Sequence, residues 1–139
     1  MTPQRGQEGQ VTVLVLGFAL VCFAVAGLAV DGTRAFLLRR TLQSKADAAA
    51  LAGASEIDVV EYYETGGESV VLEPTAARTV AEQWLAERPV HTSSEVEVTP
   101  EGIAIVMRGY VRASFLSLVG IDRVDVAVQA RAEPVAGSP

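Results

Sequence analysis

The side chains that could carry out chemistry are few and scattered in this sequence. Three carboxylates, Glu61, Glu64 and Glu68, lie close enough along the chain to suggest a cation site. Metal sites need converging ligands, and nothing nearby fixes these three, so a solvated acidic loop is the simpler interpretation. His91 is the single histidine and lies in a polar turn. Any histidine-based triad or metal cluster would have to use it.

No stretch has the spacing of a catalytic motif. The glycines form no phosphate-binding loop, and no serine, histidine and aspartate are spaced as a triad. The one cysteine, Cys22, lies within an apolar run, which leaves the rest of the chain without a disulfide. We therefore predict no enzyme activity, no cofactor and no metal. A membrane-tethered enzyme is a further hypothesis, but no residue supports it.

The net charge of −6 is unevenly distributed. The first fifty residues carry five basic and three acidic side chains, whereas the remaining residues carry six arginines and fourteen acidic side chains. A nucleic-acid-binding surface is normally basic, so this acidic C-terminal part argues against nucleic acid as a partner. The sequence gives no evidence of a small-molecule substrate either.

The element that must position everything else is the run from Val11 to Val30, VTVLVLGFALVCFAVAGLAV. As a helix it would span roughly 30 Å, the thickness of the hydrocarbon core of a bilayer. A buried core helix is the alternative, but the rest of the chain is too short to surround it. We predict a membrane span that includes Val11, Leu14, Phe18, Cys22, Phe23 and Val30.

A cleaved signal peptide is an alternative to this membrane anchor. The triplet Ala24-Val25-Ala26 is compatible with a signal-peptidase site. Cleavage near Ala26 would release a secreted binding module. The apolar run extends past the triplet, and helix-forming sequence follows it, which favours the uncleaved signal-anchor.

Residues 31–56 are predicted to extend the span as a helical stalk, because strong helix formers dominate them. Apolar positions recur three and four residues apart on one face, and the side chains on that face become very small towards the end of the helix. Small residues allow helices to approach closely. The candidates for helix packing are Asp31, Ala46, Ala49, Ala50, Gly53 and Ala54. This face packs either on a partner, which could be a second copy, or on the sheet of its own domain.

The remaining residues predict an α+β domain, with one helix on a short antiparallel sheet of about three to four strands. Residues 1–10 form a polar leader, residues 57–73 an acidic linker with a strand at 69–72, and residues 74–133 the domain; residues 134–139 are a disordered tail. Pro74 begins the domain's helix, and Trp84 is expected to anchor it on the sheet. A hairpin, a helical turn capped by Ser114 and a closing strand around 124–130 follow.

The segment from Gly9 to Ala54 resembles the N-terminal part of TadG-like proteins of Flp (tight adherence, Tad) pilus systems. The resemblance rests on the junction Ala29-Val30-Asp31-Gly32-Thr33-Arg34 and on the later run LQSKADAAALA, Leu42 to Ala52. The pilin processing site, a glycine followed by a glutamate inside the apolar run, is missing. The resemblance implies a membrane-anchored bacterial assembly component at the cell surface. Other Tad/Flp pilus proteins would then be its partners.

The charges that flank the span conflict with this resemblance over orientation. Four basic side chains follow the span between residues 34 and 45, whereas Arg5 alone precedes it. The positive-inside rule alone would place the C-terminal side in the cytoplasm, but the resemblance implies an extracytoplasmic domain. We expect the latter, because Asp31 lies nearer the membrane than the basic cluster, most of which begins two turns further along the helix.

Overall fold

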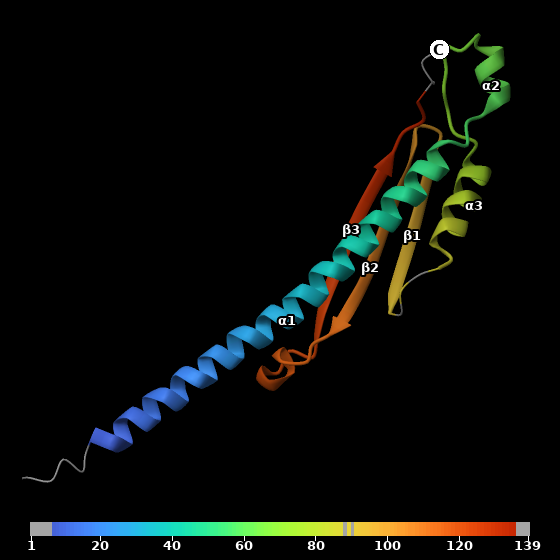
Figure 1. The fold of residues 1–139 in the computed structure, drawn as a ribbon. Helices are drawn as coiled ribbons and strands as arrows, with labels where there is room; N and C mark the ends of the chain where they lie inside the picture. The colour runs from blue at the N-terminus through green and yellow to red at the C-terminus, as the bar shows by residue number, and fades with distance from the viewer. Residues whose placement is uncertain (1–6, 88, 90, 136–139) are drawn as a thin grey trace, which may run out of the picture.

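The computed structural model describes residues 7–87, 89 and 91–135. It confirms the α+β class, with a long N-terminal helix followed by a small domain (Figure 1). The elements in chain order are α1 (Gln7–Ala54), α2 (Val59–Glu64), α3 (Pro74–Leu85), β1 (Thr92–Thr99), β2 (Gly102–Arg112), the 3-10 helix η1 (Leu116–Val119) and β3 (Arg123–Ala132). Much of the predicted leader and most of the predicted tail lie outside the described residues.

Helix α1 is continuous over 48 residues, about 72 Å at the usual helical rise. Its sequence contains no proline, so no backbone hydrogen bond is lost along its length. Its N-terminal half projects alone, whereas its C-terminal half lies along the sheet (Figure 1). Among the described residues, α1 is long and apolar enough to cross a membrane.

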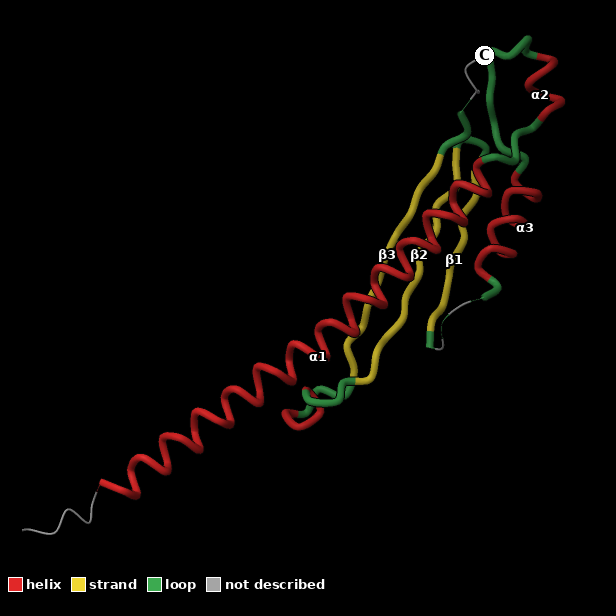
Figure 2. Tube along the Cα trace, in the orientation of Figure 1, coloured by secondary structure: helices red, strands yellow, loops and turns green. Residues whose placement is uncertain are grey.

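The sheet has three antiparallel strands in the order β1-β2-β3 (Figure 2). The predicted hairpin is confirmed as β1 and β2, with Val96 opposite Ile105. Alternate residues of β2, Ile103, Ile105 and Met107, are buried on one face. Helices α1 and α3 cover that face (Figure 1). Within the described residues no helix covers the other face, so the domain has two layers.

The core lies between α1, α3 and the sheet, and much of it is made of alanine. Ala46, Ala49 and Ala50 of α1 are at most 1% exposed. A Cβ added at Gly53 would lie 2.7 Å from Ile103 Cδ1 and 3.0 Å from the Ala77 carbonyl oxygen. Small side chains therefore set how closely α1 approaches its own domain.

The expectation that Trp84 anchors α3 on the sheet is wrong, because the side chain is 57% exposed. The buried side chains of α3 are Ala77, Ala81 and Leu85, which recur four residues apart. Helical geometry places such residues on one face, so Ala77, Ala81 and Leu85, and not Trp84, form the buried contact of α3 with the rest of the domain.

The predicted strand at residues 69–72 is reduced to an isolated bridge between Ile57 and Leu72. The Leu72 N–H donates to the Pro100 carbonyl, and the Glu73 N–H donates to the Glu56 carbonyl. The segment is thus divided between two neighbouring turns and cannot form a ladder with either. The helix after it begins at Pro74, as predicted, and the Glu73 carboxylate caps it by accepting from the Thr75 and Ala76 N–H groups.

Candidate functional site at the base of the domain

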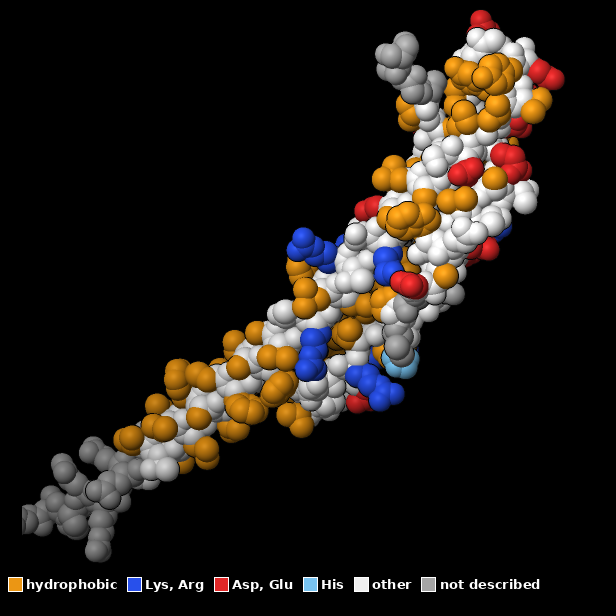
Figure 3. Space-filling model, turned by 45° about the vertical axis from the view of Figure 1, so that its right-hand side comes forward, with side chains coloured by type: hydrophobic (Ala, Val, Ile, Leu, Met, Phe, Trp, Pro, Cys, Tyr) orange, Lys and Arg blue, Asp and Glu red, His pale blue; other side chains and the backbone are white. Residues whose placement is uncertain are grey.

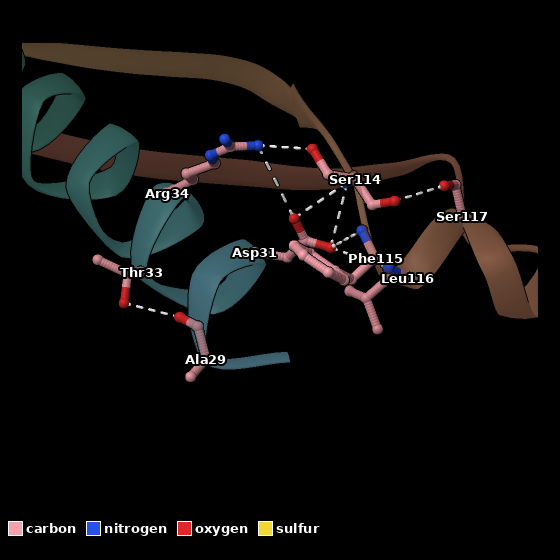
Figure 4. Close-up of polar contacts among 8 residues, drawn as sticks. All are labelled: Ala29, Asp31, Thr33, Arg34, Ser114, Phe115, Leu116 and Ser117. Carbon is pink, nitrogen blue, oxygen red and sulfur yellow. Dashed lines mark hydrogen bonds and ion pairs between the residues drawn. The ribbon is translucent and has the colours of Figure 1, made fainter. Parts of the chain in front are cut away.

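A buried carboxylate lies where the apolar half of α1 gives way to the packed half. Asp31 is 1% exposed and is the one buried charged side chain among the described residues. Its helix brings it beside the loop between β2 and β3, which lies next to the middle of α1 (Figures 1 and 4). A buried charge is costly unless it is paired and hydrogen-bonded, so its partners explain how it is tolerated.

The partners of Asp31 are three successive backbone N–H groups of that loop (Figure 4). The Phe115 and Leu116 N–H groups each donate to Oδ2 at 2.8 Å. The Ser114 N–H donates to Oδ1 at 3.0 Å and to Oδ2 at 3.2 Å. Such N–H groups at the start of a helix have no partner within it. Asp31 therefore caps η1 from another element, 83 to 85 residues away in sequence.

This arrangement corrects the expected role of Ser114. No side chain at the N-cap position of η1 caps it, and the Ser114 hydroxyl instead accepts a 2.6 Å hydrogen bond from Arg34 Nη1. The same guanidinium lies 4.0 Å from Asp31 Oδ1. Gly120 ends η1 in the left-handed conformation, with φ of 87°, as expected for a glycine stop.

The hydrogen bonds at this junction favour the ionised carboxylate. The N–H groups of Leu116, Ser114 and Phe115 lower the pKa of Asp31 below its ordinary value, with the Arg34 charge as a smaller contribution. Burial acts in the opposite direction, but it does not reverse the shift. A carboxylate with its charge held in this way is suited to fixing a loop and poorly suited to proton transfer at neutral pH.

An apolar contact on the same side of α1 reinforces the polar one. The rings of Phe23 and Phe115 meet edge to face, with centroids 5.8 Å apart. Gly27 lies between Phe23 and Asp31 on α1, and a Cβ there would come within 2.6 Å of the Phe115 side chain. Glycine at this position allows the loop to approach the helix. Phe23, Gly27 and Asp31 are four residues apart and so form one continuous stripe.

The structure places the predicted site residues in two different environments. The span residues Val11, Leu14, Phe18, Cys22, Phe23 and Val30 are all exposed on the projecting half of α1. The helix-packing candidates Ala46, Ala49, Ala50, Gly53 and Ala54 lie in the core of the chain's own domain. The alanine face was predicted to pack either on a partner or on its own domain, and in the structure it packs on its own domain.

The other residues considered for chemistry do not converge. No group of three or more histidine, cysteine, aspartate or glutamate side chains within residues 7–87, 89 and 91–135 could hold a metal ion. His91 stacks on Tyr110 with ring centroids 4.8 Å apart, beside a hollow of about 570 Å³ on the outer face of the sheet. The Arg123 guanidinium also lies over the Tyr110 ring, 5.6 Å from the ring centroid.

Sequence reasoning named Asp31 as a packing residue but did not identify the loop that it binds. The available signal was the charge itself, since an aspartate directly after an apolar run needs a partner. The partner groups are backbone amides, and any loop of the domain has amides. Only the fold shows which loop supplies them.

Comparison with known proteins relates the helix to a described family. Residues 9–56 match the Tad family model, described as Flp pilus-assembly TadE/G-like. The matched region covers most of α1, including Asp31, and the resemblance noted for this part of the chain is thereby confirmed. No curated protein matches the chain, and no solved structure matches it.

Proposed function

We propose, from the TadE/G-like segment at residues 9–56, that the protein is a single-pass membrane component of Flp pilus assembly. Helix α1 crosses the membrane with its apolar half, and the small domain is held outside the cytoplasm at the cell surface. The protein acts through helix packing and protein–protein contacts, without catalysis. Its partners are other Tad/Flp proteins or a second copy.

The observation that carries the proposal is the contrast within α1. The projecting half is apolar on all sides and its large side chains are exposed, as expected of a helix in lipid. The other half buries one face against the domain and carries four basic side chains between residues 34 and 45. Membrane insertion of the first half would bury an apolar surface that the domain leaves largely exposed.

The junction at Asp31 supports a mechanical role for the domain. A continuous helix and a loop fixed to it by three N–H groups allow little independent motion at the membrane surface. The domain would therefore keep a defined position relative to the bilayer. A rigid spacer of this kind suits a component that positions other subunits.

The alternative of a cleaved, secreted module is less well supported. Cleavage near Ala26 would fall within a continuous helix. It would also remove Phe23, whose ring packs on Phe115 of the domain. Both observations favour retention of the anchor.

Contacts with partners would involve surfaces other than the alanine face, because the domain itself covers that face. The exposed side chains of the span, such as Leu14 and Phe18, are available to another helix in the membrane. The exposed tip of α2 and the outer face of the sheet are available outside it.

Protease protection in spheroplasts tests the topology. We expect a full-length chain with a C-terminal tag in the membrane fraction, and we expect external protease to remove the tag. A matched control carries the tag at the N-terminus, which should be protected. A protected C-terminal tag would place the domain in the cytoplasm and contradict the proposal. A shortened soluble species with its N-terminus near Gly27 would show that the secreted module is correct.

A further inference from the structure

The loop between β2 and β3, residues 113–122, exposes large apolar side chains at the base of the domain. Leu118 is 78% exposed, Val119 72% and Ile121 47%. On the face shown in Figure 3, hydrophobic side chains line the projecting part of the molecule up to the point where it meets the domain. These three residues thus extend an apolar surface that is otherwise formed by α1.

The position of the loop along α1 places it beside the end of the span. Its Phe115 contacts Phe23 and Gly27, which precede Val30 by seven and three residues. At the helical rise these contacts lie about 10 Å and about 5 Å inside the apolar run. Elements that lie in the interface of a bilayer bury their apolar side to a depth of about 5–10 Å, which is the same range.

Many backbone N–H groups of the loop already have hydrogen-bond partners in the protein. A segment in the hydrocarbon region must satisfy its polar backbone groups without water. Here the N–H groups of Ser114, Phe115 and Leu116 donate to Asp31. Further donors bond to carbonyl oxygens within the loop: Ala113 to Asp122, Leu118 to Phe115, Gly120 to Ser117 and Ile121 to Leu116. The Ser117 hydroxyl donates to the Ser114 carbonyl.

Basic side chains surround the base of the domain directly above this loop. Arg112 and Arg123 are opposite each other where β2 and β3 enter the loop, and Arg34 hydrogen-bonds Ser114 within it. Lysine and arginine side chains gather where the projecting helix meets the domain (Figure 3). If the loop enters the apolar layer, these arginines reach the level of the phosphate groups, where anionic lipids attract them.

We propose that residues 115–121 form a second membrane contact, inserted into the leaflet on the domain's side beside α1. Leu118, Val119 and Ile121 enter the upper hydrocarbon region, and Arg34, Arg112 and Arg123 bind lipid phosphates. Asp31 is then the residue that holds the inserted loop against the span. This inference rests on the membrane-anchor part of the proposed function and adds a specific lipid-binding element to it.

The test uses the full-length chain with Cys22→Ser, labelled with an environment-sensitive fluorophore at one introduced cysteine. The substitutions are Leu118→Cys in the loop, Phe18→Cys in the span and Val60→Cys on α2; the last is 66% exposed and lies at the far end of the domain. The protein is reconstituted at low density in vesicles of phosphatidylcholine and phosphatidylglycerol. Quenching by lipid-attached nitroxides and by aqueous iodide is measured for each label.

We expect the labels at positions 18 and 118 to be quenched by lipid nitroxides and protected from iodide, and the label at 60 to show the opposite. The loop insertion would be overturned, and the anchor left intact, by one combination of results. In it, iodide quenches the label at position 118 as strongly as the label at position 60, while the label at position 18 is still quenched by lipid nitroxides. Failure of the label at 18 to reach lipid would overturn the anchor itself. Protection of 118 from both quenchers would indicate a protein contact and would also overturn the insertion.

Discussion

The two halves of α1 are one unbroken helix in two different surroundings. In the first half, large side chains such as Leu14 and Phe18 are more than two-thirds exposed. In the second half, Ala46 and Ala49 are completely buried. The first half is apolar on all sides, whereas the second half has one apolar face and carries four basic side chains between residues 34 and 45.

The two halves also differ in side-chain size, because Ala46, Ala49, Ala50 and Gly53 line the buried face of the second half. Alanine and glycine let two backbones approach closely, which suits packing against α3 and the sheet. In the first half, large apolar side chains such as Leu14 and Phe18 stay exposed, and the domain contacts this half only around Phe23, Gly27 and Asp31 in the described residues. The comparison teaches that the face of small residues packs on protein in this chain, and that the run of large apolar residues without charges is left exposed and is long enough to cross a membrane.

Paired glycine substitutions provide the strongest test of this comparison. Gly53→Leu places its side chain against Ile103 and the Ala77 backbone, and we expect a loss of about 1–3 kcal/mol or more in the free energy of unfolding, as for other overpacked cores. Gly17→Leu is the matched control, because a Cβ there meets nothing within 4 Å. Thermal unfolding in detergent micelles measures both. Equal melting temperatures for the two variants would contradict the conclusion that the second half of α1 is packed against the domain and the first half is exposed.

Substitution of Asp31 should have an intermediate effect that is confined to the junction. In Asp31→Asn the charge is lost and the amide NH₂ is another donor among the loop N–H groups. We expect faster hydrogen exchange at Ser114, Phe115 and Leu116, with little change in the core. Asp47→Asn is the control, because Asp47 is exposed and accepts from Gln43 alone in the described hydrogen bonds. Unchanged exchange at residues 114–116 would contradict the capping role.

The same contact should depend on pH in a definite direction. The pKa of Asp31 is lowered in the folded protein from an ordinary value of 3.8. A carboxylate with a lowered pKa stabilises the fold fully above its unfolded value, and this contribution is lost as the pH falls through the folded value. We therefore expect the wild-type loop to loosen only below about pH 4, and Asp31→Asn to lack this transition.

The smallest effect on stability is expected for Trp84, the residue that the sequence predicted to anchor α3 on the sheet. Trp84→Ala should change the free energy of unfolding by less than about 0.5 kcal/mol, as is usual for exposed positions, because the side chain is 57% exposed. Leu85→Ala, one residue further and 2% exposed, should cost about 2–5 kcal/mol. Chemical denaturation compares the two. A larger loss for Trp84→Ala would show that the indole is covered in solution.

Local patterns predicted most elements of this fold. The uncharged run, the proline at the start of α3 and the alternation in β2 and β3 each reflect chemistry within a few neighbouring residues. The segment at 69–72 was less predictable, because a strand needs a partner, and its partners are two turns far apart in sequence. Burial of Trp84 was predicted from its size and hydrophobicity, whereas the buried contact of α3 is made by Ala77, Ala81 and Leu85.

The sequence by itself determined that a long apolar helix comes first, that small residues form one face of its second half, and that a small sheet follows. These features depend on periodicity and side-chain size, which are local. Only the tertiary structure decided that the alanine face packs on its own domain, and that Asp31 holds the loop at residues 114–116. Both depend on which segments meet in space, and backbone N–H groups, the partners of Asp31, are the same in every sequence.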